Sequence, residues 1–232
     1  MDDAADPTAS AHEEAAAVPP CVLIGDIVGS RATTDRQALH DAVEAALAAV
    51  DDVVPSVSGL RVTAGDEFQG TYATLGAAVE AALRVRLTLL PQVDTRFGLG
   101  RGEVAVLDPV RGIEDGPGWW AARAAIEEVE EAAGRAPTRH ARTAYRAADD
   151  RPSTVHDAAQ PALNAALLCR DHLVGSLSDR SLRLLRGLMD PHTTQGELAA
   201  REGISPSAVS QRVRADGIGA VLAAQDLLRG MP

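Results

Sequence analysis

A short, uninterrupted apolar run early in the chain is the feature that most constrains its fold. Residues 21–24 read Cys-Val-Leu-Ile, and Gly25 and Asp26 follow directly. A continuous apolar run of this length, closed by turn residues, is typical of a strand that is buried on both faces. The run therefore predicts a buried central strand that ends in a carboxylate.

The segments after this strand alternate between helical and strand patterns. Apolar residues recur at helical spacing in residues 35–50 and 75–90. Residues 60–73 alternate around a Gly-Asp pair, as in a β-hairpin, and residues 95–107 predict a further strand or strand pair. A helix is predicted for residues 116–133. A hairpin between two helices, inside two outer strands, predicts an α+β domain of ferredoxin-like βαββαβ order.

The rest of the chain predicts a helical unit after the α+β domain. Residues 134–160 are polar and contain prolines, which predicts irregular structure and a connector. Helical patterns follow at residues 161–173 and 178–189, and three short helical segments lead to the end of the chain. The expected organisation is a disordered tail at 1–18, the α+β domain at 19–150, a connector with a helix at 151–176 and an all-α domain at 177–232.

The balance of charges excludes several classes of chemistry. All 22 basic side chains are arginine, so neither a P-loop lysine nor a Schiff-base lysine is available. The formal charge of −11 argues against a protein that binds nucleic acid over its whole surface. Residues 176–232, however, hold seven arginines and six acidic residues, a net of +1. Any contact with DNA therefore belongs to the C-terminal quarter.

The cysteines and the N-terminal residues give no indication of export. Cys21 and Cys169 each lie in an apolar run and are expected to be buried packing residues, not a disulfide or a metal site. The N-terminus carries Asp2, Asp3 and Asp6 in place of a basic region, so we do not expect a signal peptide. No apolar stretch approaches the roughly 20 residues that span a bilayer. We expect a soluble, cytoplasmic protein without membrane contact.

Two aspartates are expected to meet at one end of the predicted sheet. Asp26 ends the first strand, and Asp66 lies in the turn of the predicted hairpin. These strands are neighbours in a ferredoxin-like sheet, and two carboxylates held together repel unless a cation lies between them. Because Mg²⁺ takes oxygen ligands, the pair is a candidate metal and phosphate site. The alternative is that both aspartates only stabilise turns, as aspartate often does.

Four motifs over residues 21–125 resemble those of class III nucleotidyl cyclases. Residues 24–30, Ile-Gly-Asp-Ile-Val-Gly-Ser, are similar to the metal-binding opening of that family. Residues 64–68, Ala-Gly-Asp-Glu-Phe, resemble its second metal site and also the signature hairpin of GGDEF diguanylate cyclases. Residues 96–104 resemble the next cyclase strand, and residues 115–123 resemble the late helix that supplies transition-state residues. The whole chain resembles the bacterial SatD family even more closely.

The cyclase resemblance implies a site for a nucleotide or polyphosphate with a divalent cation, Mg²⁺ or Mn²⁺. It assigns the metal to Asp26, Ile27 and Asp66, a ligand contact to Gly65, and the transition-state contact to Arg123. The metal and phosphate half of the site is therefore expected to be kept.

The base and ribose half of the cyclase pattern is replaced. Val62 stands where cyclases usually have a lysine that selects the purine, and Trp119 stands where they usually have an asparagine that orients the ribose. We therefore expect nucleotide binding more than cyclisation.

An aromatic pair and two arginines are further candidate ligand contacts. Trp119 and Trp120 could stack on a base or another planar ligand, or one of them could fill the alanine-rich core. Arg31 and Arg101 lie near strand ends, where they could pair with phosphates or remain solvated.

Residues 195–213 have the pattern of two short helices joined by a tight turn. Gly203 can take the positive φ of a helix C-cap, and Ser205 and Pro206 are a favourable start for the next helix. The segment resembles the helix-turn-helix of MarR-type regulators and of sigma-factor region four, except that Glu202 stands where these usually have an apolar residue. The alternative is a helical hairpin used for dimer contact or docking. The side chains expected to contact DNA are Ser207, Ser210, Gln211, Arg212 and Arg214.

Three functions remain open from the sequence. The first is a ligand-responsive transcriptional regulator, expected to be a homodimer, in which a degenerate cyclase-like domain binds a nucleotide or phosphorylated ligand with a divalent metal and the helix-turn-helix binds DNA. The second is an active, divergent nucleotidyl cyclase or another metal-dependent phosphoryl-transfer enzyme. The third is a non-catalytic scaffold. We prefer the first.

Overall fold

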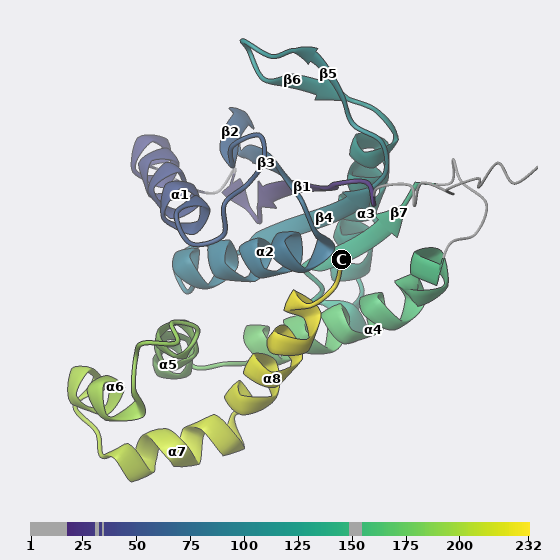
Figure 1. Cartoon of the computed structure of the whole chain (residues 1–232). Helices are drawn as coiled ribbons and strands as arrows, with labels where there is room; N and C mark the ends of the chain where they lie inside the picture. Colours follow the sequence, from purple (N-terminus) through teal and green to yellow (C-terminus); the bar gives the residue numbers. More distant parts are fainter. Residues whose placement is uncertain (1–17, 31–32, 34, 149–154) are drawn as a thin grey trace, which may run out of the picture.

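The structure is a computed structural model that describes residues 18–30, 33, 35–148 and 155–232 (Figure 1). Most of the predicted tail, residues 1–17, and the candidate Arg31 lie outside the described residues. The described part of the chain has a mixed α+β architecture, in which a five-stranded sheet is followed by a group of helices. No helix in this part is long and apolar enough to cross a membrane.

The sheet is mixed, and its strands do not follow chain order. β1 (Cys21–Ile27) lies at the centre, antiparallel to both β3 (Glu67–Tyr72) and β4 (Thr95–Arg101). β2 (Arg61–Ala64) forms one edge beside β3, and β7 (Thr143–Ala147) forms the other edge, parallel to β4. The expectation that residues 21–24 form a buried central strand is confirmed.

Helices cover both faces of the sheet (Figure 1). On one face, Leu23 and Ile27 of β1 join the main hydrophobic cluster with the first two helices. On the other face, Val22 and Ile24 pack against the third helix. The alternation of β1 side chains between two apolar layers explains why its sequence is a continuous apolar run. The three helices are α1 (Arg36–Asp51), α2 (Leu75–Leu89) and α3 (Pro117–Ala133).

Two glycines of β4 allow α3 to lie directly on the sheet. A Cβ atom at Gly98 would overlap the carbonyl oxygen of Ala122, and one at Gly100 would overlap the amide nitrogen of the same residue. Both glycines face α3, because their neighbours Phe97 and Leu99 point into the main cluster on the opposite side. The position of α3 therefore depends on the absence of two side chains.

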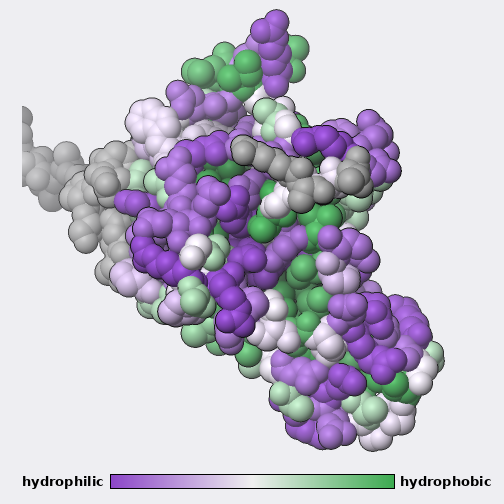
Figure 2. Space-filling model, turned by 180° about the vertical axis from the view of Figure 1, so that it is seen from behind, coloured by the Kyte–Doolittle hydropathy of each residue, from purple (hydrophilic) through white to green (hydrophobic). Residues whose placement is uncertain are grey.

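A separate two-stranded hairpin projects from the sheet between β4 and α3 (Figure 1). It consists of β5 (Ala105–Asp108) and β6 (Ile113–Asp115). Arg61 donates a hydrogen bond to the carbonyl of Gly112, and Thr71 donates one to Glu114 at 2.9 Å. These contacts fix the hairpin to the sheet, while several of its apolar side chains remain exposed; the hydropathy of the projecting hairpin is seen in Figure 2. The exposed side chains are Val106, Leu107, Val110 and Ile113.

The helices after β7 pack on α2. Leu83 and Leu87 of α2 share a hydrophobic cluster with Leu185, Leu198 and Val209 from three of these helices. The predicted helix at 178–189 and the three short helices after it are confirmed. Their bounds are α4 (Val155–Gly175), α5 (Asp179–Leu188), α6 (Gln195–Glu202), α7 (Pro206–Ala215) and α8 (Ile218–Arg229).

The expectation of irregular structure at residues 134–160 is wrong, because β7 and the beginning of α4 lie there. β7 has no apolar run. Side chains of α4 form hydrogen bonds with the main-chain groups on its outer edge. Asn164 accepts a hydrogen bond from the Tyr145 amide at 2.8 Å and donates one to the Tyr145 carbonyl at 3.0 Å, while Gln160 accepts one from the Ala147 amide at 2.9 Å. Tertiary contacts therefore define this strand.

The expectation for the cysteines is only half correct. Cys21 is fully buried in β1, but Cys169 is exposed on α4. The buried face of α4 follows Leu163, Leu167 and Arg170 at helical spacing, and Cys169 lies beside that face.

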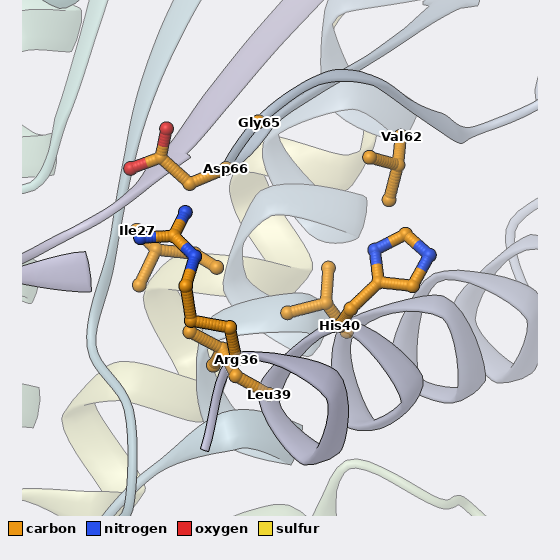
Figure 3. A pocket seen from close by; sticks show the side chains of 8 residues that line it. Ile27, Arg36, Leu39, His40, Val62, Gly65 and Asp66 are labelled. Atoms are coloured by element: carbon orange, nitrogen blue, oxygen red, sulfur yellow. The ribbon is translucent and has the colours of Figure 1, made fainter. Parts of the chain in front are cut away.

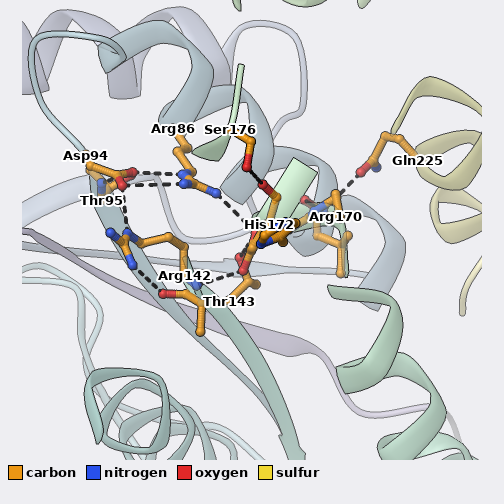
Figure 4. Close-up of polar contacts among 12 residues, drawn as sticks. Arg86, Asp94, Thr95, Arg142, Thr143, Arg170, His172, Ser176 and Gln225 are labelled. Atoms are coloured by element: carbon orange, nitrogen blue, oxygen red, sulfur yellow. Dashed lines mark hydrogen bonds and ion pairs between the residues drawn. The ribbon is translucent and has the colours of Figure 1, made fainter. Parts of the chain in front are cut away.

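Buried ion pairs join α2, α4 and the start of β7 (Figure 4). Arg86 lies 3.3 Å from Asp171, and both side chains are 1% exposed. Arg86 also contacts Asp94 at 2.8 Å, and Arg142 contacts the same carboxylate at 2.7 Å. Burial alone raises the pKa of Asp94, but Arg86 and Arg142 together bring it below its ordinary value. Asp94 is therefore held as a carboxylate between two guanidinium groups.

Replacing Asp171 by alanine is expected to lower the free energy of unfolding by about 3–5 kcal/mol, because Arg86 would keep its charge in a buried site without that partner. Urea unfolding followed by circular dichroism measures the change. Asp226→Ala, at a carboxylate that is 70% exposed, is the control and is expected to change stability by less than about 0.5 kcal/mol. Equal effects of the two substitutions would contradict this account of the buried network.

Gly98→Ala is expected to destabilise the chain by about 3 kcal/mol, because the added methyl group must displace α3 from the sheet. Gly196→Ala in α6 is the matched control, since that position is open and alanine is the better helix former. The same unfolding measurement distinguishes them. A Gly98→Ala protein as stable as the control would show that α3 does not pack as described.

Candidate functional site

The tip of the β2–β3 hairpin lies beside the loop that follows β1. Gly65 has a φ of 66°, in the left-handed region. Glycine adopts this conformation without steric cost, so it suits the first position of this two-residue turn. Asp66, the second turn residue, accepts a hydrogen bond from the buried hydroxyl of Ser30. The turn therefore holds Asp66 in a defined position next to the end of β1.

A pocket of about 160 Å³ lies between this turn and α1 (Figure 3). Arg36 and His40, one helical turn apart on α1, project into it from below the hairpin, and Asp66 lies at its opposite rim. The remaining lining is largely apolar. The pocket is smaller than the roughly 300–1,000 Å³ of most small-molecule sites, so it suits a phosphate-sized group better than a whole nucleotide. Its full lining is Ile27, Arg36, Leu39, His40, Val43, Val62, Gly65 and Asp66.

Arg36 and His40 are site residues that the sequence analysis missed. Arg36 makes no hydrogen bond or ion pair with the described part of the chain, and His40 lies 3.3 Å from Glu44. Their spacing of four residues in the first helix after β1 is a signal that was present in the sequence. It becomes informative only when the turn at Asp66 is known to face that part of α1.

Asp26 points to the other side of the sheet, toward α3. Both of its carboxylate oxygens accept hydrogen bonds from Arg96, at 2.9 and 2.8 Å, and Arg96 also lies 2.9 Å from Glu130 of α3. Burial alone lowers the pKa of Arg96, but the hydrogen bonds and charges of Asp26 and Glu130 raise it above its ordinary value. The carboxylate of Asp26 is thus neutralised by an arginine from the neighbouring strand.

Arg123 of α3 reaches the β2–β3 hairpin, where its partner is Glu67. Its two terminal nitrogens each lie 2.7 Å from a Glu67 oxygen. The hydrogen bonds that Arg123 donates to Glu67 raise the pKa of Arg123, and the charges of Glu127 and Asp26 act in the same direction. The structure therefore brings Arg123, Glu67 and Asp26 together on the α3 side, while Ile27, Gly65 and Asp66 line the pocket on the α1 side.

The donors that a metal ion needs are only partly assembled. In the described part of the chain, no group of three or more His, Cys, Asp or Glu side chains is arranged to hold a metal ion. A cation near Asp66 would therefore depend on main-chain oxygens, water or the oxygens of a bound ligand for its other contacts.

Two other candidate contacts are buried. Trp119 is 8% exposed and packs against Val22 and Ile24, whereas its neighbour Trp120 is exposed. Arg101 is 5% exposed, and its guanidinium donates to the carbonyl of Pro232. In this arrangement neither Trp119 nor Arg101 presents a free surface to a ligand.

α6 and α7 form a tight helical pair with well-defined ends. Thr194 and Glu197 form a capping box at the start of α6, and Gly203 ends that helix with a φ of 64°. Ser205 then caps α7, accepting a hydrogen bond from the Ala208 amide at 3.2 Å. These caps give the turn the conformation expected from its sequence.

The five residues predicted to contact DNA differ in how free they are. Ser207, Gln211 and Arg214 are exposed on α7, and the Ser207 hydroxyl also shares a hydrogen bond with the Ser205 hydroxyl at 2.8 Å. Ser210 donates a hydrogen bond to Gln195 at 2.7 Å, and Arg212 lies 3.5 Å from Asp216. One face of α7 thus offers an arginine, an amide and a hydroxyl to a partner.

Arginines of α5 explain the charged residue at position 202. Glu202 is 12% exposed and accepts two hydrogen bonds from Arg183, at 2.8 and 2.7 Å, with Arg180 at 3.6 Å. The hydrogen bonds from Arg183 lower the pKa of Glu202. An ion pair between α5 and α6 therefore explains why a charged residue can stand at this partly buried position.

The comparisons with known proteins agree with the similarity seen in the sequence. The sequence profile of the SatD family matches residues 21–228, and the chain therefore belongs to the SatD family. The match extends from β1 to the end of α8, so it includes both the sheet and the α6–α7 pair. A search among curated proteins finds no match.

Proposed function

We propose that this SatD-family protein is a DNA-binding transcriptional regulator whose α+β part binds a phosphorylated ligand, such as a nucleotide. The strand order β2-β3-β1-β4, with β1 antiparallel to both neighbours, supports a ferredoxin-like core extended by β7. The capped α6–α7 pair supports a helix-turn-helix of the MarR or sigma-factor type.

The exposed face of α7 is the observation that carries the DNA-binding half of this proposal. Ser207, Gln211 and Arg214 extend from the helix that follows the Gly203 turn, which is the place of a recognition helix. Hydroxyl, amide and guanidinium groups are the side chains that contact base edges and phosphates. The surface of this lobe is mostly hydrophilic on the face seen in Figure 2.

The weak positive charge of the helical unit favours action as a dimer. Seven arginines and six acidic residues in residues 176–232 leave a net of +1, which gives little attraction to a phosphate backbone. A homodimer would present two copies of α7 to successive half-sites and would double the attraction.

Arg214→Ala is expected to weaken binding to a mixed-sequence duplex at low salt by about tenfold. It should also reduce the slope of log affinity against log salt by about 1, because one phosphate contact is lost. Fluorescence anisotropy over a series of salt concentrations measures both quantities. Arg111→Ala is the matched control, since Arg111 is 78% exposed on the β5–β6 hairpin, outside the helical unit. Equal salt slopes for the two variants would remove α7 from the DNA interface.

The ligand-binding half of the proposal places a phosphate group in the pocket at the hairpin tip. Arg36 supplies positive charge and has no acidic partner in the described part of the chain, and the imidazole of His40 lies beside it in the same pocket. Asp66 and the carbonyl of Ile27 supply hard oxygen donors that fit Mg²⁺ or Mn²⁺ on the pocket side, with the remaining contacts from the ligand's phosphates, whereas Asp26 faces α3. Because Arg96 occupies both oxygens of Asp26, a metal there would have to displace Arg96. The cation is therefore expected to bind well only together with its ligand.

Asp66→Asn is expected to weaken Mn²⁺ binding by about tenfold or more in the presence of ATP, because it removes the carboxylate at the pocket rim. Electron paramagnetic resonance of free Mn²⁺ measures the binding, with and without ATP. Asp226→Asn, on the exposed face of α8, is the control. Mn²⁺ binding that is independent of both ATP and Asp66 would contradict this assignment.

An active metal-dependent cyclase or phosphoryl-transfer enzyme is the second candidate. The approach of Arg123 to the hairpin favours it, because an arginine there can stabilise charge on a transferred phosphate once it leaves Glu67. Val62 in the pocket and the buried Trp119 favour binding without cyclisation. Product formation from ATP or GTP that is lost in both Asp66→Asn and Arg123→Gln would establish the enzyme instead.

A further inference from the structure

A second pocket, of about 340 Å³, lies where the first turns of α3 meet the end of β7. Its volume falls within the range of small-molecule sites, and it shares no residue with the pocket at the hairpin tip. One aromatic side chain and one cation are set among small apolar residues. The lining is Pro117, Trp120, Ala121, Ala124, Arg146, Ala147 and Ala148.

Trp120 gives this pocket an exposed aromatic wall whose orientation is fixed. The Trp120 side chain is 63% exposed. Such exposure is unusual, because tryptophan side chains are on average highly buried. Its indole N–H donates to Asp115 at 2.9 Å, and the same carboxylate oxygen accepts a hydrogen bond from the Gly116 amide at 2.7 Å. The ring is therefore held at its polar edge while its surface remains accessible.

Small side chains leave room beside the ring. Pro117, Ala121 and Ala124 lie at helical spacing on the side of α3 that carries Trp120. Ala148, directly after the end of β7, lines the same pocket. None of these side chains extends beyond a ring or a methyl group, so the space next to the indole is apolar and shallow. A flat ligand fits such a space better than a branched one.

Arg146 provides the positive charge of the pocket. It follows Ala144, which packs against Ala125 and Val129 of α3, so the alternation of β7 directs Arg146 to the same side. The side chain is half-buried and makes no hydrogen bond or ion pair with any described residue. A partly buried guanidinium that has no carboxylate partner among the described residues is a candidate contact for an anionic group.

We propose that this pocket binds a planar aromatic anion, with its ring against Trp120 and its phosphate or carboxylate on Arg146. The aromatic ring and the cation supply the two contacts that such a ligand needs, and the alanines admit it. This site is independent of the function proposed above, because it uses neither the hairpin pocket nor α7.

Calorimetric titration of the whole chain with adenosine 5′-monophosphate, adenosine and ribose 5-phosphate tests the proposal. The monophosphate is expected to bind at least about tenfold more tightly than either fragment, because only it engages both Trp120 and Arg146. Indole-3-acetate, titrated in parallel, distinguishes a carboxylate ligand from a phosphate ligand. No binding of any of the four probes would overturn the proposal.

Substitutions locate the binding. Arg146→Gln is expected to weaken binding of the monophosphate by about tenfold or more and leave adenosine unchanged, and Ala124→Leu is expected to fill the pocket and abolish both. Trp120→Phe should retain binding and Trp120→Ala should lose it. Arg135→Gln, at an exposed arginine beyond the end of α3, is the matched control for charge. Circular dichroism verifies that each variant is folded.

One further condition separates this site from the hairpin pocket. The titrations are repeated in EDTA, where binding of the monophosphate is expected to persist and still to be lost in Arg146→Gln, because only the hairpin pocket is proposed to use a cation. Loss of binding in EDTA or in Asp66→Asn, with full binding in Arg146→Gln and Ala124→Leu, would assign the nucleotide to the hairpin tip and overturn the proposal for the Trp120 pocket.

Discussion

The buried carboxylate of Asp171 is the contact on which the arrangement of the described chain most depends. It accepts a hydrogen bond from the backbone amide of Arg142 at 2.8 Å and pairs with Arg86, and it lies 3.7 Å from Arg170. Arg170 in turn donates to Gln225 of α8 at 3.3 Å. One charge in α4 therefore links the helix α2, the beginning of β7 and the last helix. A buried charge is tolerated only when it is fully paired, so these elements must be present together.

This network makes α2 the element shared by the two parts of the molecule. One side of α2 packs in the main hydrophobic cluster with the sheet, and Leu83 and Leu87 on the other side pack with the C-terminal helices. Arg84 and Arg229 both bind the buried carboxylate of Glu80, which secures α8 to the same helix. If the protein is a regulator, a movement of α1 or the hairpin on ligand binding would be transmitted to α7 through the packing of α2.

All Lys and Arg positions of the chain are arginine. The planar guanidinium group can donate two parallel hydrogen bonds to one carboxylate, and the structure contains several such contacts. Arg96 binds Asp26, Arg123 binds Glu67, and Arg183 binds Glu202, each through two nitrogens. The sequence singled out Asp26, Glu202 and Arg123 among these residues. It did not indicate their partners, because an ion pair across strands or between helices depends on which faces meet. For the same reason the sequence did not indicate Arg36, His40 and Arg146, whose surroundings come from distant segments of the chain.

The sequence by itself determined the elements whose signals are local. The apolar run before Asp26 defined the central strand, the Gly-Asp pair defined the hairpin turn, and Gly203 with Ser205 defined the junction of α6 and α7. Only the tertiary structure decided the rest. It made β7 a strand through hydrogen bonds from α4, buried Trp119 while leaving Trp120 exposed, and turned Asp26 toward α3 while Asp66 lines the pocket beside α1. Caps and periodicity act over a few residues, whereas the burial and partners of a side chain depend on how whole layers pack.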